Sequence, residues 1–317
     1  CTVAMTTGMP TILEERLETL GGYRPHGDSL HAEPSFSHLR LEIGGHSQHV
    51  LMSVRPALPD ASGRANKLAH FLVLSSAELT HAGPAWILRQ PGVVVDRFEG
   101  PPRWIPEPRT LPKSPSVSPR RSEAWERACG DAGWAGELVN RFLLDASRLS
   151  AVIYGPECDP LELIDEALAL MPPEDRWRVT FSTHFQSAIA GVHCAWRFCL
   201  EGTPAALEVS RRANGLFLDL RETRVKGLRA GHGRYAELAR EGRAAWWSDL
   251  FEETKAQRVA ERAQRARSSE SPGQGMVQDS APNLAVVAPG ARVNEPRPAI
   301  AAVSPRRSSA RVAQTIA

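Results

Sequence analysis

The 317-residue sequence lacks several features that would place it in a functional class at once. It has no run of about 18 apolar residues, so no segment is expected to span a membrane. It has no Gly-x-x-x-x-Gly-Lys-Ser/Thr loop, which excludes a P-loop GTPase, and it has no Gly-x-Gly-x-x-Gly turn. We therefore expect neither a transmembrane segment nor a bound cofactor.

Cysteine is also scarce. The sequence has five cysteines, an odd and sparse set for this length: Cys1, Cys129, Cys158, Cys194 and Cys199. A secreted disulfide scaffold would have a denser and even-numbered set, so the composition favours a reducing cytoplasm. The chain begins without a methionine and without the charged-then-apolar pattern of a signal peptide. We expect it to be a fragment that lacks its native start, including a first strand.

A strong net charge is absent, because the formal total is +2. From position 255 onward the chain has ten Lys/Arg and four Asp/Glu, so this tail carries +6 and the remainder −4. Such a tail allows contact with nucleic acid, an anionic membrane or an acidic partner. Its arginines are scattered rather than clustered, which favours a solvated segment and makes nucleic acid an unexpected partner.

The sequence divides into four segments, and its 42% hydrophobic content is typical of a globular protein. Residues 1–100 show mixed helix and strand patterns, and residues 122–254 form the clearer domain. Residues 101–121 hold seven prolines, a density that forbids regular hydrogen-bonded structure and indicates a linker. Residues 255–317 are poor in aromatics and rich in Pro and Ser, which predicts disorder. We predict an α+β (mixed α/β) fold of two domains with a Pro-rich linker and a disordered tail.

Periodicity and terminal signals place the individual elements. Strict alternation indicates a strand over residues 39–43, which Gly44-Gly45 joins to a second strand over 49–54 as a hairpin. Asp159 and Pro160 suit the N-cap and first position of a helix that two prolines end at 172–173. Further predicted helices lie at 14–20, 77–79, 123–127, 136–149 and 234–251, with a buried element at 68–74 and strands at 150–154, 178–185, 192–200 and 216–220.

The run Ser-Gly-Arg-Ala-Asn-Lys-Leu-Ala-His over residues 62–70 supplies the candidate catalytic residues. The Arg64 guanidinium is able to bind phosphate or carboxylate, and His70 is able to act as an acid or base. If the run is a strand, Asn66 and His70 share one face. The alternative, which we favour, is structural: a Ser-Gly turn, an asparagine bonded to its own backbone and a buried histidine satisfied by a carbonyl.

Two other groups have the residue types of a catalytic or metal site but not the spacing. His184, His193, Cys194 and Cys199 suggest zinc, yet Cys194 and Cys199 point to opposite faces of a strand, so we expect no metal. Ser182 and His184 lack a nucleophile elbow and suggest a core strand. Cys158 lies at a strand-to-helix turn, where Asp159 opposes thiol activation, so a passive cysteine is favoured.

Two stretches resemble one bacterial family. The run over 62–70 resembles the Ser-Gly-Arg-x-Asn-x-x-Ala-His signature of the GTPase-associated protein 1 family, in its N-terminal domain. The block over 168–183, with two prolines before Arg-Trp and Phe-Ser-Thr, resembles the middle domain of the same family. The resemblance covers roughly residues 1–250 and implies an accessory protein that works with a GTPase or effector encoded nearby.

We therefore expect a cytoplasmic, non-enzymatic adaptor of a bacterial GTPase-centred defence or signalling system, which acts by protein docking. One alternative is an enzyme that uses Arg64, Asn66 and His70 on a phosphorylated or carboxylated small molecule. Another is a nucleic-acid or membrane-surface tether that uses the basic tail. A concave pocket shared by Arg64 and His70 would favour the enzyme, and an exposed apolar surface would favour the adaptor.

Overall fold

The computed structural model describes residues 2–20, 34–57, 66–114, 118–242, 246–253, 256, 259–260 and 313–316. Cys1–Phe251 and Ala310–Ala317 belong to one compact unit, and Glu252–Ser309 form a second. No helix of the described residues is long and apolar enough to cross a membrane. The account below concerns the first unit.

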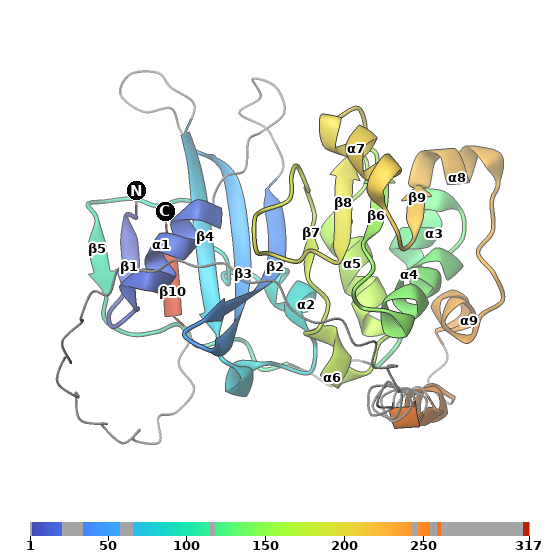
Figure 1. The fold of residues 1–317 in the computed structure, drawn as a ribbon, viewed down its shortest axis with the longest axis horizontal. Helices are drawn as coiled ribbons and strands as arrows, with labels where there is room; N and C mark the ends of the chain where they lie inside the picture. Colours follow the sequence, from blue (N-terminus) through green and yellow to red (C-terminus); the bar gives the residue numbers. More distant parts are fainter. Residues whose placement is uncertain are drawn as a thin grey trace, which may run out of the picture. The chain divides into compact units, whose positions relative to one another are not determined.

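This unit contains both helices and strands, interspersed along the chain (Figure 1). The strands are β1 (Ala4–Thr6), β2 (Ser35–Ile43), β3 (His46–Ala57), β4 (Asn66–Leu74), β5 (Arg103–Ile105), β6 (Ser150–Tyr154), β7 (Phe181–Ser182), β8 (Trp196–Leu200), β9 (Phe217–Asp219) and β10 (Ala313–Ile316). The helices are α1 (Thr11–Leu20), α2 (Pro84–Leu88), α3 (Glu123–Cys129), α4 (Gly133–Leu144), α5 (Pro160–Ala169), α6 (Pro173–Arg176), α7 (Pro204–Arg212), α8 (Leu220–Lys226) and α9 (Arg234–Glu241), with a 3₁₀ turn at Ser76–Glu78. The predicted α+β class is confirmed.

The described strands form one sheet in the order β5-β1-β10-β4-β3-β2-β7-β8-β6-β9. Its N-terminal half is mainly antiparallel, whereas β7, β8, β6 and β9 run parallel to one another. The halves meet where β2 pairs antiparallel with β7, through Ser37 with Ser182 and His38 with Phe181. Both predicted domains therefore share one sheet, and their separation as independent domains stays a prediction.

Different helices cover the two faces of this sheet. On one face, α1 packs Leu13 and Leu17 on β2, β3 and β4, and α7 packs Ala205 and Val209 on β6 and β8. The other face carries the largest core, to which α2, α3, α4, α5, α8 and α9 contribute. The register across β2, β7 and β8 keeps α1 and α7 on the same side.

The N-terminal elements follow the predictions closely. The hairpin forms with Gly44 and Gly45 at φ of 59° and 79°, values that favour glycine. The predicted linker differs, because Arg103–Ile105 forms β5, parallel to β1. Arg109 also donates hydrogen bonds to the carbonyls of Gly92 and Val93. Three consecutive residues between the prolines pair with β1 as a strand. The prediction that the prolines forbid regular hydrogen-bonded structure was therefore wrong for Arg103–Ile105.

Three predicted elements of the middle part are shorter than expected, and one is the strand predicted over 192–200, which is only Trp196–Leu200. The strand predicted over 178–185 is only Phe181–Ser182. It ends there because the Phe36 amide donates to the Thr183 hydroxyl, at 2.8 Å, instead of to a backbone carbonyl of the strand. The helix predicted over 234–251 ends at Glu241, since Gly242 adopts φ 63° as a left-handed C-cap. Helices α7 and α8 were not predicted.

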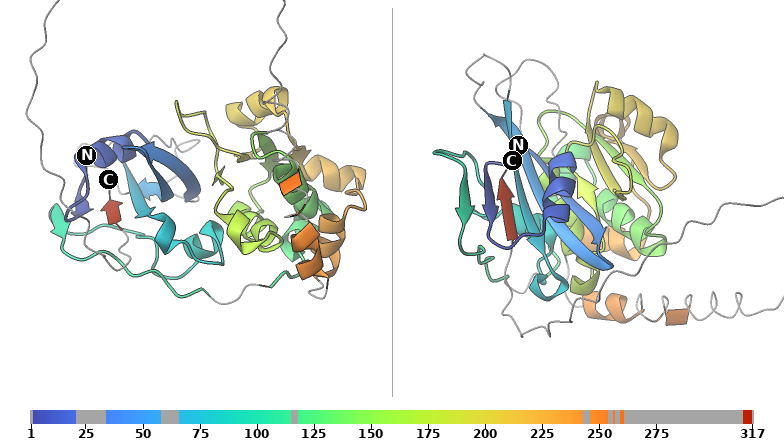
Figure 2. Two further views of the ribbon diagram at one scale, coloured as in Figure 1. Left: turned by 60° about the horizontal axis from the view of Figure 1, so that its bottom comes forward. Right: turned by 60° about the vertical axis from the view of Figure 1, so that its left-hand side comes forward.

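The tail contributes one strand that its composition did not predict. β10 (Ala313–Ile316) pairs antiparallel with β1 and β4. The marks for the two chain ends lie side by side in both views of Figure 2. Most of the predicted disordered tail falls outside the described residues.

A buried arginine closes the corner between α5 and β7. Arg176 is 0% exposed, and its guanidinium donates to the carbonyls of Met171, Ala169 and His81 at 3.1, 3.1 and 2.7 Å. Burial lowers its pKa to about 10, so the group stays charged at neutral pH. Trp177 follows, donating its indole N–H to the Thr80 carbonyl at 2.6 Å. The corner thus fastens the middle part to residues 80–81 of the N-terminal part.

Two stacked histidines lie beside this corner. His38 Nδ1 is 2.6 Å from the Val179 carbonyl oxygen, which only accepts, so Nδ1 carries the proton. His38 Nε2 then accepts from His49 Nδ1 at 3.0 Å. The rings stack at 7° with centroids 5.2 Å apart, and Trp177 meets both edge-on. Burial lowers the pKa of His38 to about 3 and that of His49 to about 4.

A bidentate ion pair joins α4 to α9. Arg240 donates to both carboxylate oxygens of Asp131 at 2.8 Å. Burial opposes ionisation of this carboxyl, but the hydrogen bonds from Arg240 and two backbone amides prevail and lower its pKa to about 2. A Cβ at Gly136 would lie 2.2 Å from the Tyr235 backbone, so this crossing requires glycine.

We predict that Arg176→Met lowers the free energy of unfolding by at least about 3 kcal/mol, because three backbone carbonyls, two of them buried, lose a charged donor. Arg178→Met is the matched control, since this arginine is 38% exposed, forms an ion pair with the neighbouring Asp175 and lies over the Phe142 ring. We expect it to cost less than about 1 kcal/mol. Urea unfolding measures both, and equal costs would contradict the role assigned to the Arg176 corner.

The histidines predict an acid-sensitive fold. A histidine whose folded pKa is lowered binds protons in the unfolded state first, so its contribution to stability is complete above about pH 6.5 and is lost as the pH falls. Between pH 6 and 4 the free energy of unfolding should fall by up to about 1.4 kcal/mol per pH unit for each of the buried histidines His38, His49 and His70. Thermal melts should show this slope flattened in His38→Asn and unchanged in the exposed control His46→Gln.

Candidate functional site

The structure separates the predicted catalytic residues. Asn66 begins β4, is exposed, and its Oδ1 accepts from the Lys67 amide at 2.9 Å. His70 lies on the same face of β4, as predicted, but is 1% exposed. Four residues along a strand place the two about 13 Å apart. Arg64 lies outside the described residues, so its role stays a prediction.

His70 is held as a neutral, enclosed imidazole. Its Nδ1 accepts from the Val95 amide at 3.2 Å, so the ring proton is on Nε2. Nε2 is buried without a hydrogen-bond partner in the described part of the chain. Burial, followed by the positive charges of Arg109 and Arg55, lowers the pKa of His70 to about 3. The partner is an amide rather than the predicted carbonyl, and the ring has no exposed atom with which to reach a substrate.

Among the cysteines that drew attention in the sequence, Cys194 and Cys199 are buried and Cys158 is partly buried. Burial raises the pKa of Cys194 and of Cys199 to about 12. Burial and the charge of Glu157 raise the pKa of Cys158, so the turn before α5 does not activate it. In the described chain, no three or more His, Cys, Asp or Glu side chains are arranged to hold a metal ion.

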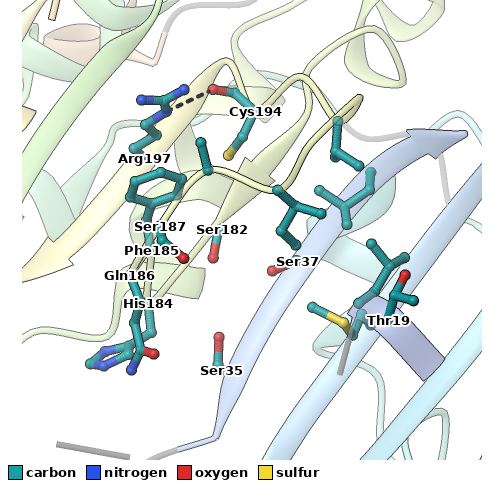
Figure 3. A pocket seen from close by; sticks show the side chains of 16 residues that line it. Thr19, Ser35, Ser37, Ser182, His184, Phe185, Gln186, Ser187, Cys194 and Arg197 are labelled. Atoms are coloured by element: carbon teal, nitrogen blue, oxygen red, sulfur yellow. Dashed lines mark hydrogen bonds between the residues drawn. The ribbon is translucent and has the colours of Figure 1, made fainter. Parts of the chain in front are cut away.

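A cavity of about 250 Å³ lies on the α1 face of the sheet, where the N-terminal and middle halves meet. We call it the serine pocket, because Ser35, Ser37, Ser182 and Ser187 line it (Figure 3). The chain over residues 184–189 forms one side. Arg16 at the base of α1 donates to the Ala190 carbonyl at 2.7 Å and so ties this loop to α1.

Strand pairing builds the floor of the serine pocket. Met52, Ser37, Ser182 and Arg197 are register partners across β3, β2, β7 and β8, so they form one row on the same face. Ser35 lies two residues before Ser37 and points to that face as well. Figure 3 shows the hydroxyl groups of Ser35, Ser37 and Ser182 directed into a common space.

Arg197 ends this row next to an aromatic ring. Its guanidinium carbon lies 4.5 Å from the centroid of the Phe185 ring, and its Nε donates to the Cys194 carbonyl at 3.3 Å. It has no carboxylate partner within the described residues. His184 lies at the pocket too, with Nδ1 3.3 Å from the Tyr154 hydroxyl.

The sequence analysis missed this pocket. It treated Ser182 and His184 as part of a core strand, and it gave no role to Ser35, Ser37 or Arg197. A signal was present, because serines occupy the two positions of β2 that precede apolar residues on the same face. The pairing of β2 with β7 joins positions more than 140 residues apart, and periodicity does not reveal such partners.

A second cavity, of about 280 Å³, lies before α5 beside Cys158. Two of its basic groups already have partners: Arg127 contacts Glu162 at 2.9 Å, and Arg224 donates to the Arg127 carbonyl. We assign no site there.

Comparison with known families agrees with this two-part sheet. GTPase-associated protein 1, N-terminal domain type 2, matches residues 1–111, and GTPase-associated protein 1, middle domain, matches residues 122–222. Neither the curated proteins nor the solved structures contain a match. The order of the matches confirms the resemblance of the 62–70 run and the 168–183 block. The chain belongs to the GTPase-associated protein 1 family.

Proposed function

We propose that the chain is a non-enzymatic adaptor of a bacterial GTPase-centred defence or signalling system, acting in the cytoplasm by docking to a GTPase or effector encoded nearby. The family name implies a GTPase, and the chain's own sequence has no P-loop. The observation that carries the adaptor role is the enclosure of His70. His70 is the acid–base group of the family signature, and it lies in the protein interior.

The enzyme alternative needs Arg64, Asn66 and His70 at one accessible place. Asn66 is exposed and His70 is buried, so the two described members do not share an opening. The tether alternative depends on the basic tail, most of which lies outside the described residues. The folded unit therefore supports docking more than either alternative.

One sheet edge has the properties of a docking surface. β5 is an edge strand of the described sheet, so its outer backbone groups have no strand partner there. Trp104 at its centre is 64% exposed. Exposed edges accept an added strand from a partner, and tryptophan is enriched in binding hot spots. The adaptor would use β5 to pair with an extended segment of its partner.

We predict that Trp104→Ala weakens binding of the co-expressed neighbouring GTPase by at least tenfold without lowering the melting temperature, because this side chain is largely exposed. Leu207→Ala on α7 is the matched control, since Leu207 is 66% exposed. Co-purification and titration of the GTPase in its GDP- and GTP-bound forms measure both. Full binding by Trp104→Ala would refute docking at β5.

The signature residues give a second test. His70→Ala should lower the free energy of unfolding by about 1–3 kcal/mol, because the buried Val95 amide loses its acceptor. Asn66→Ala should change it by less than about 0.5 kcal/mol, since that side chain is exposed. Partner binding should fall only in proportion to unfolding. A folded variant of either residue that binds the partner fully but loses activity in the host would instead support the enzyme.

A further inference from the structure

We infer that the serine pocket binds a small organic anion, a carboxylate or phosphate carried on an apolar body. This site is independent of the proposed docking at β5, because it lies where β2, β7 and β8 meet.

The first argument is the state of the serine hydroxyls. Ser35 and Ser37 are 3% and 2% exposed, yet they and Ser182 have no hydrogen-bond partner within the described residues. Each hydroxyl oxygen is reached from the cavity, because none of the three is among the fully buried side-chain atoms of the described chain that lack a partner. These three point into the cavity rather than into packed protein (Figure 3), so their donors are available to a bound molecule.

The second argument is charge. None of the described residues that line the serine pocket is an aspartate or glutamate, and Arg197 is among them. Arg197 has no carboxylate partner in the described chain, and its stacking on Phe185 holds it at the end of the serine row. Hydroxyl donors and an unpaired guanidinium together favour an oxyanion.

The third argument is the apolar part of the lining. Leu39, Met52, Ile189 and Val192 line the pocket and belong to the apolar cluster that α1 covers. Ligand pockets combine such an apolar lining with a few placed polar groups. A volume of about 250 Å³ exceeds what a free inorganic ion fills, so the anionic group should be attached to an apolar body.

The test is a calorimetric titration of the full chain with four probes: phenyl phosphate, benzoate, inorganic phosphate and the neutral benzyl alcohol. We expect saturable binding of phenyl phosphate or benzoate, at least tenfold weaker binding of inorganic phosphate, and none of benzyl alcohol. Comparison of phenyl phosphate with benzoate identifies the preferred oxyanion. Absence of saturable binding of both up to 10 mM (roughly −2.7 kcal/mol) would overturn the inference, as would equal binding of benzyl alcohol.

Two variants locate the binding. The double variant Ser37→Ala with Ser182→Ala should weaken binding of the anion about tenfold. Arg197→Met alone should also weaken it about tenfold. Ser53→Ala is the matched control, because Ser53 is also a buried serine without a partner but lies on the opposite face of β3. The melting temperatures of all three should stay close to that of the parent. Unchanged affinity in the serine variant, or an equal loss in Ser53→Ala, would overturn the assignment.

Discussion

The fold depends on how one buried guanidinium satisfies backbone carbonyls from two parts of the chain. The pairing of β2 with β7 covers only two residue pairs, which is little to hold two halves of a sheet in register. Arg176 adds hydrogen bonds to the end of α5 and to His81 of the N-terminal part. Gly83 allows this approach, since a Cβ there would lie 3.0 Å from the arginine Cβ. A buried charge is tolerated here because it is hydrogen-bonded on all three nitrogens.

Each of the two stretches that resemble the family places a buried polar side chain against the backbone of another segment. The 168–183 block contains the prolines that end α5, the arginine that fastens the halves and Phe181 of β7. The 62–70 run ends in His70, whose ring accepts the Val95 amide beneath the sheet. Arg176 and His70 are buried polar groups with fixed backbone partners, and loss of a partner would be costly.

Local signals predicted much of the fold, and long-range pairings account for most of what they missed. Asp159 caps α5 through its side chain, and the glycine hairpin forms, because each depends on residues within a few positions. β5 and β10 have little strand character of their own and form by pairing with β1. The predicted site residues were named from a motif, which did not reveal that His70 is buried while Asn66 is exposed. The serine pocket requires three strands that only the folded sheet brings together.

The position of the serine pocket connects ligand binding to the stability of the junction between the two halves. Its floor combines Ser37 of the N-terminal half with Ser182 and Arg197 of the middle half. A molecule bound there contacts both halves at once and so stabilises their paired arrangement. The gain in stability grows with the logarithm of the ratio of the ligand concentration to its dissociation constant. The edge strand β5 lies at the far end of the same sheet order. An anion at the junction would therefore favour the folded, paired form of an adaptor without occupying the edge that its partner would use.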